Sequence, residues 1–141
     1  AYLQELVEHH VSGQMKVAPE HSEDVVLRMM GKPGSASLIA FRELFYRMSR
    51  AAGKENYLTY YLIAAHPGCG EPEMQRLKQF ADRTLRISPE QLQIFTPTPS
   101  TYSSLMYYTE MDPFTGRPLF VEKDPVRKAR QKNIVIRKRK R

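Results

Sequence analysis

The order of apolar and polar positions predicts an alternation of strands and helices from the start of the chain. Residues 2–10 have the spacing of a short amphipathic helix, and 14–18 (QMKVA) have the composition of a strand, which Pro19 is expected to stop. Ser22 is a good N-cap and acidic residues follow it, so we predict a helix over 23–30.

The clearest helical pattern lies in the middle of the first half. Apolar residues recur at steps of three and four from Phe41 to Ala52, and Gly53 follows as a C-terminal cap. The next segment, 57–65 (YLTYYLIAA), has no polar alternation at its end, so we expect a strand covered on both faces. The sequence 66–68 (HPG) ends that strand.

Two more helices and one more strand follow. Residues 72–86 carry one apolar stripe and begin with proline, which predicts a helix, and 91–96 (QLQIFT) predict a third strand. A rigid turn over 97–100 leads into a short helix over 101–109. The crossovers are long enough to make the strands parallel, so we predict an α/β fold of three parallel βα units, either an open sheet or half a barrel.

The end of the chain has a different character. A turn at 114–117 (FTGR) before 118–122 predicts a small hairpin, and Asp124-Pro125 is a capping pair that opens a basic helix and tail. We therefore divide the chain into a body, 1–111, and a C-terminal extension, 112–141.

Composition places the chain among ordinary globular proteins. It has 141 residues, 41% of them hydrophobic and 26% charged, which fits one domain. The first residues, AYLQELVEHH, lack the basic start and apolar stretch of a signal peptide, and no apolar run is long enough to span a bilayer. We therefore expect a cytoplasmic protein with no membrane partner.

Cysteine usage limits the possible metal chemistry. Cys69 is the single cysteine, so the chain has no internal disulfide and cannot by itself hold an iron-sulfur cluster. His66 and Cys69 have the spacing of half a metal site, but no second pair of ligands accompanies them, and we predict no metal ligand in this chain. The first residue, Ala1, is not methionine, which we take as weak support for a fragment.

Polar and conformationally restricted residues follow all three predicted strands. They lie at 19–22 (PEHS), 66–70 (HPGCG) and 96–101 (TPTPST). In a parallel sheet these three turns meet at the carboxyl edge, where α/β proteins bind their ligands. Any one of them has the composition of an ordinary turn, whereas three together favour a binding site.

Two other features have competing interpretations. Tyrosines that would stack on bases or a cofactor are more often half-buried packing residues, which is the interpretation we prefer here. They are Tyr57, Tyr60, Tyr61, Tyr102, Tyr107 and Tyr108.

The net charge is +7, but 127–141 hold nine cations and no acid, so the rest of the chain carries −2.

The basic end supports an alternative function, a module that binds RNA or another polyanion through counterion release. Its binding residues would be Arg127, Lys128, Arg130, Lys132, Arg137, Lys138, Arg139, Lys140 and Arg141. A plain solvated or disordered tail is the other interpretation of the same run.

Three stretches resemble signature segments of the YgiQ-type radical S-adenosylmethionine proteins. They are SGQMKVAPEH, YYLIAAHPGC and QIFTPTPSTYSSLMYYTEMDP, and the similarity extends from about residue 9 to residue 134. More distant radical S-adenosylmethionine enzymes have glycines where Ala65 and Ser100 stand, and a glutamate where Cys69 stands.

The resemblance implies that 1–111 form the last three units of a six-unit partial (β/α)6 barrel. The three cluster cysteines of such enzymes follow the first strand, which this chain lacks. The full-length enzyme would bind a [4Fe-4S] cluster and S-adenosylmethionine, and cleave the latter to methionine and a 5′-deoxyadenosyl radical. The partner of this chain would then be the N-terminal half of the same enzyme, with an unknown substrate and reaction.

The resemblance also implies roles for the strand-end residues. Glu20 and His21 would approach the ribose or the substrate. The adenine side would be lined by Ala65, His66, Pro67 and Gly68, and the far wall by Thr96, Thr98 and Thr101. No catalytic residue is assigned. The fragment alone would be inactive, hold no tightly bound cofactor, and self-associate through its open sheet edge.

Overall fold

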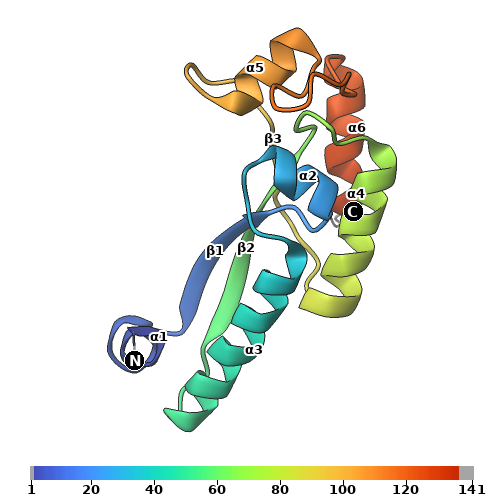
Figure 1. The fold of residues 1–141 in the computed structure, drawn as a ribbon. Helices are drawn as coiled ribbons and strands as arrows, with labels where there is room; N and C mark the ends of the chain where they lie inside the picture. Colours follow the sequence, from blue (N-terminus) through green and yellow to red (C-terminus); the bar gives the residue numbers. More distant parts are fainter. Residues whose placement is uncertain (1, 137–141) are drawn as a thin grey trace, which may run out of the picture.

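The computed structural model describes residues 2–136, and its element order matches the predicted alternation. Three strands form one sheet in the order β1-β2-β3, and both pairings are parallel. They are β1 (Gln14–Glu20), β2 (Tyr57–Ala64) and β3 (Gln93–Ile94). The predicted α/β class with three parallel βα units is confirmed, and the sheet is open rather than a closed barrel (Figure 1).

Helices follow every strand. After β1 come α2 (Asp24–Met29) and α3 (Ser35–Ala51), after β2 come α4 (Glu71–Phe80) and the π-helical turn η2 (Ala81–Leu85), and after β3 comes α5 (Tyr102–Thr109). The chain begins with α1 (Tyr2–Glu5) and η1 (Leu6–His10), and α6 (Pro125–Val135) is its last helix within the described residues. Within those residues no helix is long and apolar enough to cross a membrane.

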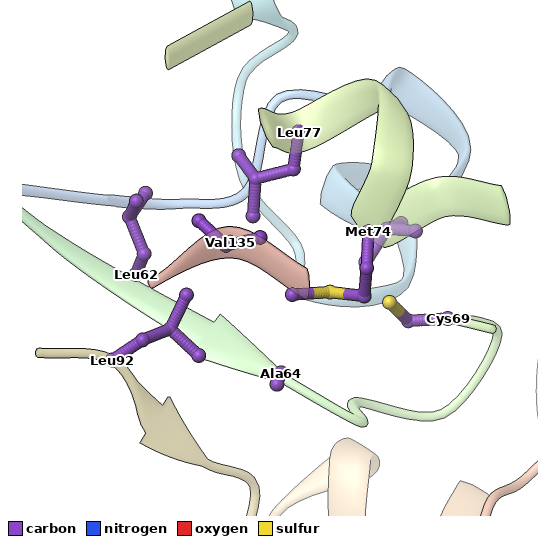
Figure 2. Packing of buried hydrophobic residues seen from close by; sticks show 8 residues of the cluster. Leu62, Ala64, Cys69, Met74, Leu77, Leu92 and Val135 are labelled. Atoms are coloured by element: carbon purple, nitrogen blue, oxygen red, sulfur yellow. The ribbon is translucent and has the colours of Figure 1, made fainter. Parts of the chain in front are cut away.

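The core lies between one face of the sheet and the helices α3, α4 and α6, which all stand on the same side of it in Figure 1. Leu62 and Ala64 of β2 face α4 and α6 in the larger cluster, as Figure 2 shows. That cluster consists of Val26, Leu62, Ala64, Cys69, Met74, Leu77, Leu92 and Val135. A second cluster packs Phe45 of α3 and Val7 of η1 against Leu58.

The prediction that both faces of β2 are covered is wrong. Leu58 and Leu62 are buried against the helices, whereas Tyr57 on the opposite face is 52% exposed. On β1 the same alternation leaves Gln14 and Lys16 exposed. Side chains alternate between the faces of a strand, so the pattern of β2 is that of a sheet with one covered face.

Two strand boundaries also differ from the prediction. Pro19 does not stop β1, which runs to Glu20 through an irregular register between Val17 and Glu20. A proline has no N–H to donate, and such an irregularity is where a strand accommodates it. The third strand was predicted over 91–96, but only Gln93–Ile94 pair with β2.

The C-terminal extension packs on the body of the fold. Val135 of α6 is 3% exposed within the larger core cluster, and α6 lies along α4 (Figure 1). The predicted hairpin is present in a minimal form, with a single antiparallel bridge between Met111 and Pro118. Its turn is closed by Asp112 O, which accepts from Gly116 N at 2.8 Å.

Candidate functional site

Three loops leave the carboxyl edge of the sheet, as the sequence predicted. The first loop, Glu20–Glu23, follows β1; the second loop, Ala65–Gly70, follows β2; and the third loop, Phe95–Thr101, follows β3. Because the strands are parallel, all three begin at the same edge, next to α5 in Figure 1. This edge is the candidate site.

Each loop contains one non-glycine residue in the left-handed backbone region. These residues are Glu20 (φ 67°), Ala65 (φ 60°) and Ser100 (φ 62°). Such conformations cost free energy in residues that carry a Cβ, and they concentrate where a fold positions a ligand or a catalytic group. The glycines that more distant enzymes carry in place of Ala65 and Ser100 would adopt these angles without that cost.

His21 of the first loop is buried, with 1% of its surface exposed. Its Nδ1 accepts from the backbone N–H of Glu23 at 3.1 Å, so in the neutral ring the proton is on Nε2. Nε2 lies 3.4 Å from Cys69 Sγ and donates to it. Burial lowers the pKa of His21 to about 4, so the ring is neutral near pH 7. The preceding residue, Glu20, pairs through its carboxylate with Lys32 Nζ at 3.2 Å.

His66 joins the second loop to the elements that follow β3. Its Nδ1 is 2.9 Å from Pro67 O, which can only accept, so Nδ1 carries the proton. Nε2 therefore accepts from the Ser103 hydroxyl at 2.7 Å. The ring also meets Phe95 edge-on at 5.1 Å, and burial lowers its pKa.

Cys69 is an unreactive thiol in this setting. It is fully buried, and burial raises its pKa to about 12, the nearby Glu73 carboxylate adding to the effect. A metal ligand or nucleophile requires the thiolate. The two residues of the His66-x-x-Cys69 spacing have separate hydrogen-bond partners, and residues 2–136 contain no group of three His, Cys, Asp or Glu suited to a metal ion.

The other predicted wall residues differ sharply in accessibility. Ala65, His66 and Pro67 are buried, and only Gly68 of that set is partly exposed. Thr96 and Thr98 of the third loop are exposed. Thr101 is the N-cap of α5, where its hydroxyl accepts from the Ser104 N–H at 3.1 Å. The loops therefore meet through buried contacts and present Gly68, Thr96 and Thr98 outward.

The six tyrosines named in the sequence analysis differ in exposure. Tyr57, Tyr102 and Tyr108 are 52%, 62% and 71% exposed, so the packing interpretation is wrong for these three. Tyr60, Tyr61 and Tyr107 are half-buried, as packing residues are.

The cations of α6 are mostly engaged within the protein. Arg127 pairs with Glu122 at 3.0 Å, and Arg130 pairs with Glu71 at 3.0 Å. Lys128 donates to the Tyr107 hydroxyl at 2.9 Å and lies over its ring, while Lys132 is half-buried. Arg137, Lys138, Arg139, Lys140 and Arg141 lie outside the described residues.

A pocket of about 260 Å³ lies beside the first loop on the helix-covered face of the sheet. Apolar side chains such as Val17, Leu27 and Phe41 form much of its wall. His21 of the first loop lines it, whereas residues of the second and third loops do not, so the pocket borders the candidate site only on the side of the first loop.

Gln131 is the functional candidate that sequence reasoning missed. It stands on α6, is 1% exposed, and bonds to the second loop at both Ala65 and Cys69. These partners are more than 60 positions away in the chain, and a single glutamine in a basic helix gives no local signal of such contacts.

Comparison with known proteins finds relatives along nearly the whole chain. The chain is 59% identical over 139 residues to a UPF0313 protein of Fusobacterium nucleatum, 46% identical over 137 residues to one of Geobacter sulfurreducens, and 43% identical over 134 residues to one of Methanosarcina acetivorans. The chain is a homologue of UPF0313 proteins. These alignments cover 99%, 96% and 95% of the chain, and no family model matches it.

The chain is much shorter than those UPF0313 proteins. It spans 24%, 22% and 18% of the length of the three relatives, about a fifth to a quarter. The similarity is therefore consistent with a part of a larger protein.

Proposed function

We propose that this chain is the later part of a radical S-adenosylmethionine enzyme, and that its three strand-end loops line the S-adenosylmethionine and substrate site. The observation that carries the proposal is the meeting of three loops, each with a left-handed non-glycine residue, at the carboxyl edge of an all-parallel sheet. Further support comes from the resemblance of the strand-end stretches to YgiQ-type radical S-adenosylmethionine proteins, and the UPF0313 relatives, which are much longer than this chain, fit a part of a larger protein.

The polar groups of the loops fit the nucleoside part of S-adenosylmethionine. Ser22 Oγ is buried beside His21 and has no hydrogen-bond partner within the described residues. A buried hydroxyl without a partner is rare, and a ligand oxygen would satisfy it. The exposed hydroxyl of Thr98 offers a donor to a ligand, whereas the exposed hydroxyl of Thr96 donates to Ile94 O at 3.5 Å.

The cluster does not fit the described residues. A [4Fe-4S] cluster needs several thiolates, whereas the single cysteine of this chain is buried as a protonated thiol with a pKa of about 12. Its ligands would belong to a part of the longer protein outside this chain. We accordingly propose that the chain alone is inactive and that its partner is the rest of the same polypeptide.

The residues of this chain would orient and enclose the cofactor rather than transfer protons. When bound, S-adenosylmethionine would supply radical chemistry after one-electron reduction by the cluster. Neutral, internally bonded His21 and His66 keep the loops in one conformation near pH 7. Buried contacts between the loops exclude water from behind the site.

The first test is to read the coding DNA upstream of Ala1 and to express the complete reading frame without oxygen. We expect three closely spaced cysteines upstream, about four iron and four sulfide per chain, and formation of 5′-deoxyadenosine from S-adenosylmethionine on reduction. A start codon at the first residue, or a complete protein that holds no iron, would contradict the proposal.

A matched pair of variants tests the site itself. Ser22→Ala removes the unpartnered hydroxyl, and Ser12→Ala removes an exposed hydroxyl at the other end of β1. In the complete protein we expect Ser22→Ala to weaken S-adenosylmethionine binding about tenfold, which corresponds to about 1.4 kcal/mol for one hydrogen bond. Ser12→Ala should leave it unchanged. Equal affinities in both variants would exclude Ser22 from the site.

A further inference from the structure

The second loop is held by the C-terminal extension in addition to bonds between its own residues, such as the Cys69 N–H donating to His66 O at 2.9 Å. The Ala65 N–H donates to Gln131 Oε1 at 3.0 Å, and Gln131 Nε2 donates to Cys69 O at 3.2 Å. One amide side chain therefore spans the loop from its first residue to its last turn. Because one partner only donates and the other only accepts, the orientation of the amide is fixed.

Burial makes this contact costly to lose. Gln131 is 1% exposed, and Ala65 and Cys69 are both 0% exposed. Removal of the amide would leave a backbone N–H and a backbone carbonyl without partners away from water. The Ala65 N–H has a further neighbour, the Cys69 sulfur, which is a weak acceptor and does not replace an amide oxygen.

Two other contacts from the same region hold the middle and the end of the loop. The Gly68 N–H donates to Phe120 O at 2.8 Å, just before α6. Glu71, directly after the loop, pairs with Arg130 of α6 at 3.0 Å. The extension therefore bonds to the loop at Ala65, Gly68 and Cys69, and to α4 at Glu71.

The contact continues into the first loop. Cys69 Sγ lies 3.8 Å from Gln131 Oε1 and accepts from His21 Nε2 at 3.4 Å. His21 in turn accepts from the Glu23 N–H at 3.1 Å. A continuous set of hydrogen bonds thus joins α6, the second loop and the first loop.

We propose that Gln131 is a positioning residue, which fixes the first and second loops in the conformation that receives the nucleoside of S-adenosylmethionine. This inference rests on the proposed function for the identity of the ligand. The hydrogen bonds to the loop are independent of that identity. The C-terminal extension is in this view a part of the site architecture.

The test uses the complete, cluster-loaded protein and three variants. Gln131→Met keeps the length of the side chain and removes both hydrogen bonds. Gln131→Glu keeps the acceptor for Ala65 and loses the donor to Cys69 O. Asn133→Ala changes an exposed residue of the same helix and is the control. The readouts are amide hydrogen exchange in 65–70 and in α3, the Kd for S-adenosylmethionine, and iron content.

We expect Gln131→Met to raise amide hydrogen exchange in 65–70 about tenfold or more, and to raise the Kd for S-adenosylmethionine by a similar factor. Exchange in α3 and the iron content should not change. Gln131→Glu should fall between Gln131→Met and the wild type, and Asn133→Ala should match the wild type. Unchanged exchange in 65–70 would overturn the inference. A uniform rise in amide exchange across the fold, including α3, would also overturn it, because it marks a merely structural role. An unchanged Kd for S-adenosylmethionine together with faster exchange in 65–70 would overturn it as well.

The inference and the proposed function fail in different ways. If the wild-type protein binds no S-adenosylmethionine while Gln131→Met still loosens 65–70 alone, the ligand assignment is wrong and the control of the loop by Gln131 stands. If the wild type binds the ligand and Gln131→Met binds it equally well, the ligand assignment stands and the positioning role is wrong.

Discussion

The second and third loops leave the same edge of the sheet in the same direction, yet they are held by different means. The second loop is buried and its partners, Phe120 and Gln131, lie far away in the sequence. The third loop is largely exposed, and its bonds are local, such as the Thr101 hydroxyl donating to Thr98 O at 3.2 Å. The second loop combines its own bonds with these distant partners, whereas the third loop is held mainly by its own prolines and hydroxyls, apart from Phe95, whose N–H donates to Ala64 O.

The difference suggests a division of roles at the edge of the sheet. A buried loop with satisfied polar groups is rigid and supports the site, whereas an exposed loop has hydroxyls that a ligand can reach. Substitutions in the second loop should therefore affect stability, and those in the third should affect binding. Four predictions test this contrast.

The largest expected contrast is in cysteine reactivity. In a Thr98→Cys variant, an alkylating reagent at pH 8 should modify Cys69 about a thousandfold more slowly than the introduced cysteine, because Cys69 is buried with a pKa of about 12. Peptide mass spectrometry distinguishes the two sites in one sample. Both should react fully in denaturant. Similar native rates would contradict the buried position of Cys69.

Removal of a side chain from each loop gives the next effect. His66→Ala should lower the free energy of unfolding by about 3 kcal/mol, because it leaves a cavity and unpaired groups at Pro67 and Ser103. Thr98→Ala should change it by less than about 0.5 kcal/mol, since the side chain is exposed. Urea unfolding measures both, and equal losses would remove the distinction between the loops.

Acid should lower the free energy of unfolding through His21, which joins the first and second loops. The pKa of His21 is about 4 when folded and about 6.5 when unfolded, so below pH 6.5 the unfolded chain binds the extra proton. The stabilisation is present above pH 6.5 and is lost as the pH falls toward 4. Between pH 7 and pH 5 we expect a loss of about 2 kcal/mol, with His66 adding to it.

The control for this pH dependence is His21→Gln, which cannot titrate. Its free energy of unfolding should vary less between pH 7 and pH 5 than that of the wild type, although its stability at pH 7 is lower. The range stops at pH 5 because Glu73 adds its own loss in more acidic solution. Burial raises the pKa of Glu73, but hydrogen bonds from the backbone N–H groups of Gly70 and Glu73 itself, and then from Arg76, outweigh it and lower the pKa. An identical slope in the variant would show that His21 is not the titrating group.

The smallest effect concerns the left-handed residues. Ser100→Gly should raise the free energy of unfolding by about 0.5–1 kcal/mol, because glycine adopts a φ of 62° without steric cost and the lost side chain is exposed. Ala65→Gly relieves the same strain but removes a fully buried methyl group, so the two terms offset and little change is expected. A gain in Ala65→Gly larger than in Ser100→Gly would contradict this reasoning.

The same contrast explains what the sequence could predict. The helix spacing from Phe41 to Ala52 and the breaks at proline and glycine are local or periodic features. They predicted the order of the elements and the edge of the sheet from which the three loops leave. The boundaries of β1 and β3 were less accurate, because Pro19 lies in a register irregularity and the pairing of β3 depends on its partner strand.

Other features depend on which surfaces meet. The sequence of β2 is apolar enough for a strand covered twice, and its single covered face follows from the position of the helices. Likewise, the buried state of Ala65 and His66 depends on α6, which begins 60 residues later than Ala65. No periodicity within either segment encodes that encounter.

The Gln131 contact also has a consequence for synthesis on the ribosome. Ala65 and its hydrogen-bond partner are 66 positions apart, and the chain is made from the N-terminus at roughly 5–20 residues per second. The second loop therefore exists for about 3–13 s before its partner has been polymerised, and longer before that partner leaves the exit tunnel. During this interval the Ala65 N–H and the Cys69 carbonyl are bonded to water, and the loop reaches its final form only after translation of α6.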